Sequence, residues 1–492
     1  MTNNAAAAIR FVLDGQVVTV TDAKPTTTLL DYLREQGRCG TKEGCAEGDC
    51  GACTVVLGEL NGEHIDYRAV NSCIRFLPTV AGKALVTVES LQAADGTLHP
   101  VQQAMVDCHA SQCGFCTPGF VMSLFALYLR NAAPTRETVV EALAGNLCRC
   151  TGYRPIIDAG CKASQYAEPS HWSRVAAQAP ALITALRAVQ NDEAAALPGF
   201  QAPRSIEALA TAYAATPNAL LLAGGTDIGL WVTKQLRALP PIIYLGDIAE
   251  LKTISDDTEA LTIGAAASLT DAWAALIAHY PSLAEVAQRF ASPPVRNSGT
   301  LGGNVANGSP IGDSMPPLLA LNAEVLLRHA ASTRRLPLHA FYLGYQQKDL
   351  APGEFVAGIR IPHAAIDTKF ACYKLSKRID QDISAVCAAF ALRIVDGIIV
   401  DAKLAFGGMA AVPARAVQAE AALIGQAWTE AAFTRAAAAL AADFQPLSDL
   451  RASSAYRLRA AGNLLQRFYL EHSDAAPGLP LPVLRTHAVA VP

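Results

Sequence analysis

The sequence predicts an α+β protein built from several domains. Its 492 residues are enough for about three or four domains of ordinary size. Hydrophobic residues make up 51% of the chain, so it can bury sizeable cores and is not expected to be disordered. The N-terminal part of the chain has patterns typical of strands, and the part that follows has the apolar spacing of helices. The second half contains glycine-rich turns that follow apolar strands.

Composition excludes several classes of function. The net charge is −4 and no long basic run occurs, so no nucleic-acid partner is expected. The N-terminus does not read as a signal peptide, and no window of about 18 residues is apolar enough for a membrane helix. Thirteen cysteines without an export signal favour a reducing, cytoplasmic location, where clustered thiols bind metal more often than they form disulfides.

The first region predicts a small sheet packed on one helix. The predicted segments are a hairpin over 9–20 with its turn at Asp14-Gly15, a helix over 28–34 that ends at Gly37, and strands over 54–57 and 84–88. Two hairpins on one helix, with a cysteine loop between them, give the β-grasp layout of a small ferredoxin domain.

A cysteine loop follows the predicted helix of this region. Three cysteines have the plant-type C-x4-C-x2-C spacing of a 2Fe–2S site, with two glycines between them: Cys45, Cys50, Cys53, Gly48 and Gly51. Glycines let the backbone wrap a cluster without Cβ clashes. A fourth thiolate is needed, and Cys73 is the first cysteine available. Ordinary buried thiols are the alternative, but this density and spacing favour the cluster.

A second group of cysteines lies among predicted helices over 101–107, 120–130 and 137–143. A C-x2-C pair and a C-x-C pair supply four thiolates: Cys113, Cys116, Cys148 and Cys150. Four sulfurs suit either zinc or another iron–sulfur cluster. Because C-x-C is atypical of structural zinc sites and one cluster is already predicted, a second 2Fe–2S cluster is favoured over a zinc-binding scaffold.

The region after the connector at 166–200, which has a predicted helix over 176–189, contains two glycine-rich turns. A predicted buried strand over 220–223 runs into Gly224-Gly225-Thr226-Asp227-Ile228, and a second turn covers 299–304, followed by 307–313. Such turns free backbone N–H groups to surround phosphates, and two of them can hold the two phosphates of a dinucleotide. Neither turn matches G-x-G-x-x-G, so a Rossmann site is not predicted.

The last region predicts a sheet with helices after it. Strands are expected over 370–375, 385–395 and 398–406, with a hairpin turn at Asp396-Gly397, and helices over 428–442 and 454–471. The charged run 374–382 is interpreted as a solvated hairpin loop. The proline-rich tail over 476–492 is expected to extend over the surface.

These motifs together resemble the iron–sulfur/flavin subunits of bacterial xanthine dehydrogenases, in the molybdenum hydroxylase family. The segments that carry the resemblance are 44–55, 71–73, 112–119, 146–153, 223–227, 300–304, 309–313 and 406–410. The cysteine motifs are typical of the wider family. The order on one chain, with the clusters first and the flavin domain second, is what points to xanthine dehydrogenases within it.

The resemblance implies a role for individual residues. One 2Fe–2S cluster would be held by Cys45, Cys50, Cys53 and Cys73, and the other by Cys113, Cys116, Cys148 and Cys150. The residues implied in FAD binding are Leu222, Ala223, Gly224, Gly225, Thr226, Asp227, Ile228, Gly229, Phe290, Thr300, Leu301, Gly302, Gly303, Asn304, Asp313, Val356 and Lys374. Gln112 would contact the pterin of a molybdenum cofactor. The segment 378–382 would influence NAD access to the flavin. Two positions depart from the family, with Val356 in place of a leucine and Gln346-Gln347 in place of a basic pair.

The resemblance also implies a domain plan. It comprises a ferredoxin-like 2Fe–2S domain over 7–92, a helical-bundle 2Fe–2S domain over 93–165, a linker over 166–200, an α/β FAD-binding domain of the vanillyl-alcohol-oxidase/CO-dehydrogenase-flavoprotein type over 201–365, a C-terminal α+β flavoprotein domain over 366–475, and the tail over 476–492.

The implied function is electron transfer. A large partner subunit would bind the molybdopterin cofactor and oxidise hypoxanthine and xanthine to urate. Electrons would then cross the two clusters to FAD and NAD+, in an (αβ)2 heterotetramer, with no residue of this chain catalysing the purine step. Two alternatives stay open: the same role with another N-heterocycle or an aldehyde as substrate, and a non-catalytic ferredoxin-like carrier. The glycine-rich turns argue against the carrier, which needs no flavin domain.

Overall fold

A computed structural model describes residues 8–190 and 197–473. The chain divides into two compact units. Unit 1 takes residues 1–249 together with 291–299, and unit 2 takes residues 250–290 together with 300–492. The predicted tail over 476–492 lies outside the described residues.

Unit 1 begins with a five-stranded sheet of order β2-β1-β5-β3-β4, in which β1 and β5 are parallel. Its strands are β1 (Ile9–Leu13), β2 (Gln16–Val20), β3 (Thr54–Asn61), β4 (His64–Asn71) and β5 (Ala84–Val86). Helix α1 (Leu29–Glu35) is capped by Thr28, whose Oγ1 accepts from the backbone N–H of Asp31 at 3.0 Å, and it buries its apolar face. The predicted β-grasp layout is confirmed.

One strand of this sheet was absent from the sequence prediction. β4 pairs with β3 over eight residues, and Asn61, the last residue of β3, is followed by the two-residue turn Gly62-Glu63, with Gly62 at φ 61°. Asn-Gly is a strong hairpin signal and would have revealed the strand. The strand predicted over 84–88 is also shorter than expected. It stops at Val86, because Thr87 caps a 3-10 turn, Val88–Ser90, through a capping box with Ser90.

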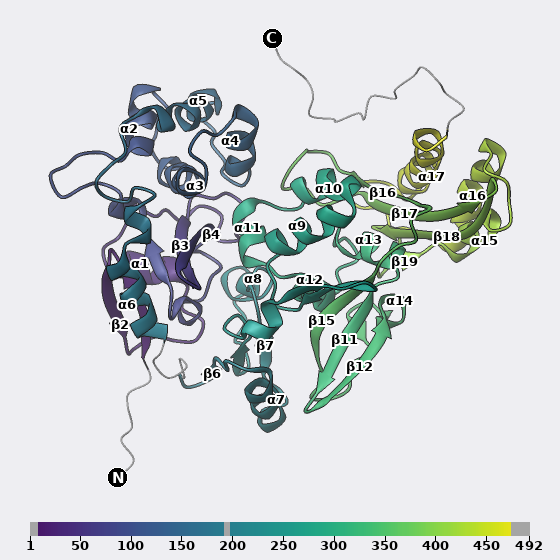
Figure 1. Cartoon of the computed structure of the whole chain (residues 1–492), viewed down its shortest axis with the longest axis horizontal. Helices are drawn as coiled ribbons and strands as arrows, with labels where there is room; N and C mark the ends of the chain where they lie inside the picture. The colour runs from purple at the N-terminus through teal and green to yellow at the C-terminus, as the bar shows by residue number, and fades with distance from the viewer. Residues whose placement is uncertain (1–7, 191–196, 474–492) are drawn as a thin grey trace. The chain divides into compact units, whose positions relative to one another are not determined.

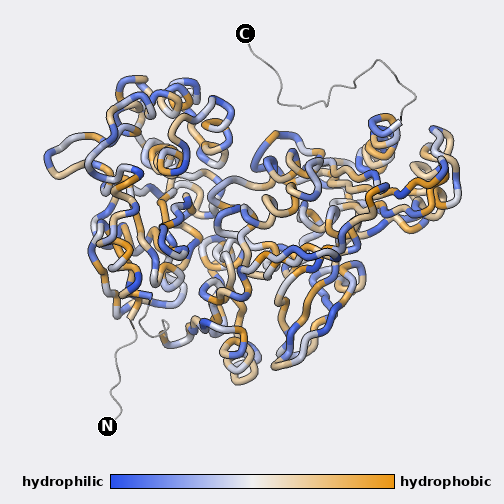
Figure 2. Tube along the Cα trace, viewed as in Figure 1, coloured by the Kyte–Doolittle hydropathy of each residue, from blue (hydrophilic) through white to orange (hydrophobic). Residues whose placement is uncertain are grey.

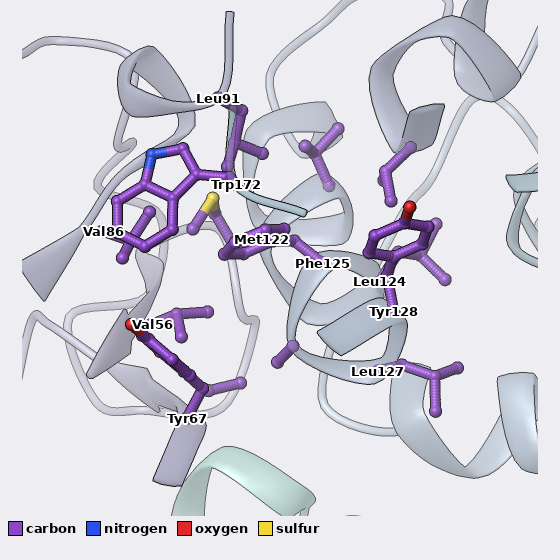
Figure 3. Packing of buried hydrophobic residues seen from close by; sticks show 14 of the residues in the cluster. Val56, Tyr67, Val86, Leu91, Met122, Leu124, Phe125, Leu127, Tyr128 and Trp172 are labelled. Carbon is purple, nitrogen blue, oxygen red and sulfur yellow. The ribbon is translucent and has the colours of Figure 1, made fainter. Parts of the chain in front are cut away.

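Four helices form the second part of unit 1: α2 (Pro100–Asp107), α3 (Thr117–Arg130), α4 (Arg136–Leu143) and α5 (Arg154–Lys162). The first three were predicted, and α5 was not. α3 packs on the sheet through a shared core, in which Val56, Tyr67 and Val86 face Met122 and Phe125 (Figure 3). Trp172, from the connecting segment, lies edge-on to both Tyr67 and Phe125, with ring centroids 6.2 and 6.0 Å apart. The sheet and the helices therefore share one hydrophobic core.

The connecting segment continues into a small parallel sheet. The helix predicted over 176–189 is split into a 3-10 turn, Ala176–Gln178, and α6 (Pro180–Gln190), because Pro180 begins a new helix. The remaining elements of unit 1 are β6 (Phe200–Gln201), α7 (Ile206–Ala215), β7 (Leu220–Leu222), α8 (Ile228–Thr233), β8 (Ile242–Tyr244) and α11 (Pro293–Ser298). The three strands run parallel in the order β6-β8-β7.

Unit 2 contains an antiparallel sheet of order β12-β11-β15-β10-β9. Its first elements are β9 (Ile254–Asp256), β10 (Ala260–Gly264), α9 (Leu269–His279), α10 (Ala284–Gln288), α12 (Leu301–Asn307), α13 (Met315–Ala320), β11 (Glu324–His329), β12 (Ser332–Pro337), α14 (Leu338–Phe341), β13 (Tyr342–Gly344), β14 (Gln347–Lys348) and β15 (Phe355–Pro362). Ser268 caps α9, accepting from the N–H of Asp271 at 3.1 Å, which fixes where this helix starts.

A second sheet of unit 2, with order β16-β17-β18-β19, packs against the last three helices. These elements are β16 (Thr368–Leu375), β17 (Val386–Val395), β18 (Ile398–Gly407), β19 (Ala414–Arg415), α15 (Val417–Leu423), α16 (Glu430–Asp443) and α17 (Ser454–Glu471). Phe390, Phe406 and Phe468 are fully buried between the two layers. The Asp396-Gly397 hairpin and the helix over 454–471 are confirmed, whereas β19 and α15 were not predicted.

Figure 1 labels the helices and strands of each unit. Hydrophobic and hydrophilic segments alternate along the chain in both units (Figure 2). No helix in the described ranges is long and apolar enough to cross a membrane.

Candidate functional site

The first cysteine loop connects α1 to β3 and is shaped by left-handed backbone. Ala46, Gly48 and Gly51 have φ of 54°, 79° and 69°. A Cβ on Gly48 would come within 2.5 Å of the Ile74 side chain, so the loop needs glycine there for space as well as conformation. Cys73 lies directly after β4 and, like Cys53, is buried. The structure thus folds Cys73 back onto the loop that carries the other three cysteines.

The four thiols of this set form a connected group. The Cys45 sulfur contacts the thiols of Cys50 and Cys73, and Cys73 in turn contacts Cys53. Backbone N–H groups of Glu47, Asp49 and Cys50 donate to Cys45 Sγ at 3.5, 3.3 and 3.3 Å.

Hydrogen bonds of this kind favour the thiolate, the form that binds metal. The contacts with Cys50 and Cys73 hold the pKa of Cys45 well below its usual range, although burial opposes them. The contact with Cys45, together with burial, raises the pKa of Cys73. This donor set fits an iron–sulfur cluster.

The second set lies in two loops at helix ends. Cys113 and Cys116 precede α3, and Cys148 and Cys150 lie between α4 and α5. Cys150 Sγ is 3.6 Å from Cys113 Sγ, and the thiols of Cys116 and Cys148 are in contact. All four sulfurs therefore meet in two close pairs. Burial raises the pKa of Cys116 to about 12.

Hydrogen bonds around Cys148 lower its pKa, in contrast to the raised pKa of Cys116. The Thr151 N–H donates to Cys148 Sγ at 3.4 Å. Burial opposes the shift, but the bonds from Thr151 lower the pKa of Cys148 to about 7. Cys113 and Cys150 are exposed, and so are the large side chains beside them, Phe115, Leu147 and Tyr153. Gln112, predicted to contact a pterin, is exposed at the start of the same loop.

Asn146 joins the two cysteine sets. Its buried side chain donates from Nδ2 to the Gly51 carbonyl at 3.1 Å and accepts from Ser123 Oγ at 2.6 Å. The next residue, Leu147, donates its N–H to the Cys50 carbonyl at 2.9 Å. No role was predicted for Asn146, although it lies within the segment 146–153 of the second cysteine motif. Its position two residues before Cys148 was the available signal.

The first glycine-rich turn follows β7 and leads into α8. Gly225 has φ 74°, and a Cβ on Gly224 would collide with the Ser298 carbonyl at the end of α11. The turn is therefore packed against another backbone segment of unit 1, and glycine is needed for that approach. Burial raises the pKa of Asp227, which precedes α8. The predicted strand that runs into the glycine pair is confirmed, ending at Leu222 rather than Ala223, whereas α8 was not predicted.

Helix α8 lies on the first cysteine loop. Thr233 Oγ1 donates to the Ala46 carbonyl at 2.7 Å, and a Cβ on Gly229 would come within 2.5 Å of the Ile74 carbonyl. Leu230 packs on the small core formed by Cys53, Cys73 and their neighbours. The turn and the Cys73 segment are therefore held together by direct packing.

In unit 2, the predicted second glycine-rich turn is the start of a helix. Thr300 Oγ1 accepts from the Gly303 N–H at 3.0 Å and caps α12, so Leu301, Gly302, Gly303 and Asn304 lie in its first turn. The N–H of Gly302 donates to the Ala265 carbonyl at 3.2 Å, where a Cβ on Gly302 would not fit. The true left-handed turn comes later, at Gly308, with φ 64°.

Asp313 and Lys374 form a buried ion pair in unit 2. Lys374 Nζ is 2.6 Å from Asp313 Oδ2, and Ser384 Oγ donates to Oδ1 at 2.6 Å. Arg289 donates to the Lys374 carbonyl at 2.9 Å. The interpretation of 374–382 as a solvated loop is therefore wrong at its first residue, because Lys374 lies within β16 and is only 8% exposed.

The remaining predicted flavin residues of unit 2 are also largely buried. Phe290 packs on Trp273 with ring centroids 5.7 Å apart. Val356 lies on β15, at a bulge where it pairs with Leu327 of β11. The segment 378–382 remains partly exposed.

Comparison with known protein families accounts for nearly all of the described chain. A 2Fe–2S iron–sulfur cluster binding domain matches residues 11–77, and a 2Fe–2S binding domain matches 87–161. An FAD binding domain in molybdopterin dehydrogenase matches 194–364, and a CO dehydrogenase flavoprotein C-terminal domain matches 371–472. The predicted fold class is confirmed, and the chain carries two 2Fe–2S domains and an FAD-binding domain.

Individual proteins show the same relationship. Xanthine dehydrogenase of Emericella nidulans is 33% identical over 94% of this chain and 38% of its own length. Aldehyde oxidase 2 of Cavia porcellus is 31% identical over 85% of this chain and 36% of its own length. The chain thus spans little more than a third of these relatives. A carbon monoxide dehydrogenase structure from Hydrogenophaga pseudoflava, which lacks the Mo-pyranopterin moiety of the molybdenum cofactor, is 32% identical, covers 55% of this chain and 94% of its own, and has a TM-score of 0.51.

Proposed function

Because the chain belongs to the molybdenum hydroxylase family, we propose that it is the electron-transfer part of a xanthine dehydrogenase. Electrons leave a molybdenum centre on a partner subunit, cross two 2Fe–2S clusters and reach FAD and then NAD+. The observation that carries this proposal is the position of the first cysteine set. It contacts the second set through Asn146 and the glycine-rich turn through α8, and so lies between them in unit 1.

The residues have distinct parts in this scheme. Cys45, Cys50, Cys53 and Cys73 hold one cluster, and Cys113, Cys116, Cys148 and Cys150 hold the other. N–H groups aimed at the Cys45 sulfur tune the potential of the first site, and solvent near Cys113 and Cys150 tunes the second. Bound FAD supplies the exchange between single electrons and a hydride.

The FAD-binding residues of this proposal are those that the family resemblance implies. Residues 222–229 contribute backbone N–H groups to the FAD phosphates. The N–H groups of residues 301–304 donate within the chain, so the α12 segment 300–304 is assigned to the flavin by the family resemblance. Phe290, Asp313, Val356 and Lys374 surround the ring, and Gln112 contacts the partner's pterin. The six-part domain plan, the heterotetramer and the cytoplasmic location belong to the same proposal.

The substrate is the least constrained part. Xanthine and hypoxanthine are favoured because relatives named xanthine dehydrogenase match over most of this chain. An aldehyde or another N-heterocycle is the second candidate, favoured by the match to an aldehyde oxidase. A partner's molybdenum pocket, rather than this chain, decides between them.

The first experiment is copurification and cofactor analysis. The proposal expects about four irons and one FAD per chain, NADH-dependent dye reduction, and a molybdenum-containing partner. The complex is then assayed on xanthine, aldehydes and nicotinate. Zinc in place of iron would support a zinc-binding scaffold, and iron without FAD or NADH activity would support a ferredoxin-like carrier. Either result contradicts the proposal.

The second experiment tests the Asp313 assignment. Asp313→Ala should lower FAD content or slow flavin reduction by NADH, but it also leaves Lys374 buried without its partner. Asp313→Asn keeps the side-chain shape and separates the two effects. Asp367→Asn, which affects only an exposed pair with Arg393, is the control. Wild-type FAD content and reduction rate in both Asp313 variants would rule out the assignment.

A further inference from the structure

Three metal-ligating side chains converge on unit 2, and none of them belongs to the predicted cluster or flavin sites. They are Asp256 at the end of β9, His279 at the end of α9, and His363, the residue after β15. One ligand atom from each lies within 4.8 Å of the other two. Three separate elements therefore bring a carboxylate and two imidazoles to one point.

The two imidazoles face the same carboxylate. His279 Nε2 is 3.0 Å from Asp256 Oδ2, and His363 Nε2 is 3.1 Å from Asp256 Oδ1. The rings are stacked, with centroids 4.9 Å apart and an interplanar angle of 27°. The side chains are 26% to 48% exposed, so an ion can reach them from solvent.

The surrounding backbone fixes these positions. β9 pairs with β10, and β10 pairs with β15, so the strands that place Asp256 and His363 belong to one ladder. The His363 N–H donates to the Glu259 carbonyl at 2.9 Å. The Asp257 carboxylate accepts from the N–H groups of Glu259 and Ala260 and so shapes the turn between β9 and β10. The site is thus preorganised by hydrogen bonds that do not involve the ligand atoms.

The oxygens around His363 Nε2 suit a cation as well as a proton. His363 Nε2 lies near two acceptors at once, Asp256 Oδ1 and the Asp257 carbonyl at 2.9 Å. A neutral imidazole has only one N–H to donate, and two charged imidazoles stacked this closely repel each other. A cation that replaces the Nε2 proton of His363 would lie among these oxygens, with the Asp256 carboxylate as a ligand and the Asp257 carbonyl close enough to be a further one.

We propose that Asp256, His279 and His363 bind a divalent transition-metal cation. Two nitrogens and one carboxylate oxygen suit zinc and its first-row neighbours, whereas magnesium and calcium prefer all-oxygen sites. Solvent fills the remaining coordination positions. The ion connects the edge strand β9 to the end of α9 and the end of β15, and so stabilises this part of unit 2 by binding only the folded state.

The test is a zinc titration of the full chain with its clusters and FAD intact, followed by calorimetry and thermal unfolding. Wild type should bind one more zinc equivalent than His279→Ala/His363→Ala, and Asp256→Asn should bind it at least about tenfold more weakly. Zinc should raise the melting temperature of wild type and leave that of the double variant unchanged. His339→Ala, which removes an exposed histidine from α14, is the matched control and should behave as wild type.

Two outcomes overturn the proposal. Equal zinc stoichiometry in wild type and the double variant would show that these side chains are not ligands. A lower melting temperature in the double variant, with no zinc effect in wild type, would show that they form only a hydrogen-bonded group. Iron and FAD content confirm that each variant is folded, and the milder Asp256→Asn keeps the test valid if the double variant is not.

Discussion

The two cysteine sets of unit 1 each contain four thiols, but the surroundings of these thiols differ. In the first set, Cys53 and Cys73 are buried and three N–H groups point at Cys45. In the second, Cys113 and Cys150 are exposed and exposed apolar side chains lie beside them. Burial and N–H donors change the potential of an iron–sulfur site, and exposure allows another protein to approach. The difference suits a relay with one internal station and one at the surface.

Cys73→Ser gives the largest expected effect. It removes a predicted ligand and places a hydroxyl in a buried position beside α8. Iron content should fall from about four to about two per chain, with the loss of one low-temperature EPR signal. Cys39→Ser, which changes an exposed cysteine outside the motif, is the control. If both EPR signals are unchanged in Cys73→Ser, Cys73 is not a cluster ligand, and the comparison of the two sets as two clusters fails.

Cys148→Ser should remove the other EPR signal and leave the first. Because this loop is near the surface and does not contact α8, FAD content should stay closer to wild type than in Cys73→Ser. The comparison is between two serine variants, so the chemistry of the change is matched. Equal loss of FAD in both variants would mean that the first set has no special connection to the flavin domain.

Asn146→Ala tests the junction between the sets. It removes the hydrogen bond to the Gly51 carbonyl and leaves buried groups unsatisfied, at a cost of about 1–3 kcal/mol of unfolding free energy. Denaturant unfolding measures the loss, and EPR should show changes in both signals. Asn218→Ala, at an exposed turn, is the control. A change confined to the second signal would show that the two loops are independent.

Thr233→Val has the smallest expected effect. It keeps the shape of the side chain but removes the hydrogen bond from Oγ1 to the Ala46 carbonyl, at a cost of about 0.5–1.5 kcal/mol. The first EPR signal should shift and the second should not. Thr211→Val is the matched control. Thr211, like Thr233, lies in a helix and donates from Oγ1 to a backbone carbonyl, that of Glu207, but it contacts no cysteine loop. Identical EPR spectra in the two variants would show that the contact between α8 and the first cysteine loop does not affect the first cluster.

The cysteine sets were predictable because ligand spacing is a local property of the sequence. Their exposure could not be predicted in the same way, because Leu230 of α8, which packs on Cys53 and Cys73, comes more than 150 residues later. Lys374 shows the same limit. It heads a charged run that is solvated further on, and only the distant Asp313 explains its burial. The missed strand β4, by contrast, had a local signal in Asn61-Gly62.

Helix α11 has a consequence for how the protein is made. The chain leaves unit 1 at residue 249 and returns only for residues 291–299. In this segment, Ser298 lies against Gly224, and the Asn297 side chain donates to the Ala69 carbonyl at 2.9 Å. Arg296 lies 4.0 Å from Glu141. A nascent chain therefore cannot complete unit 1 until residue 299 has left the ribosome. Folding of the unit that carries all eight cysteines predicted as cluster ligands must wait for synthesis of the first segment of unit 2.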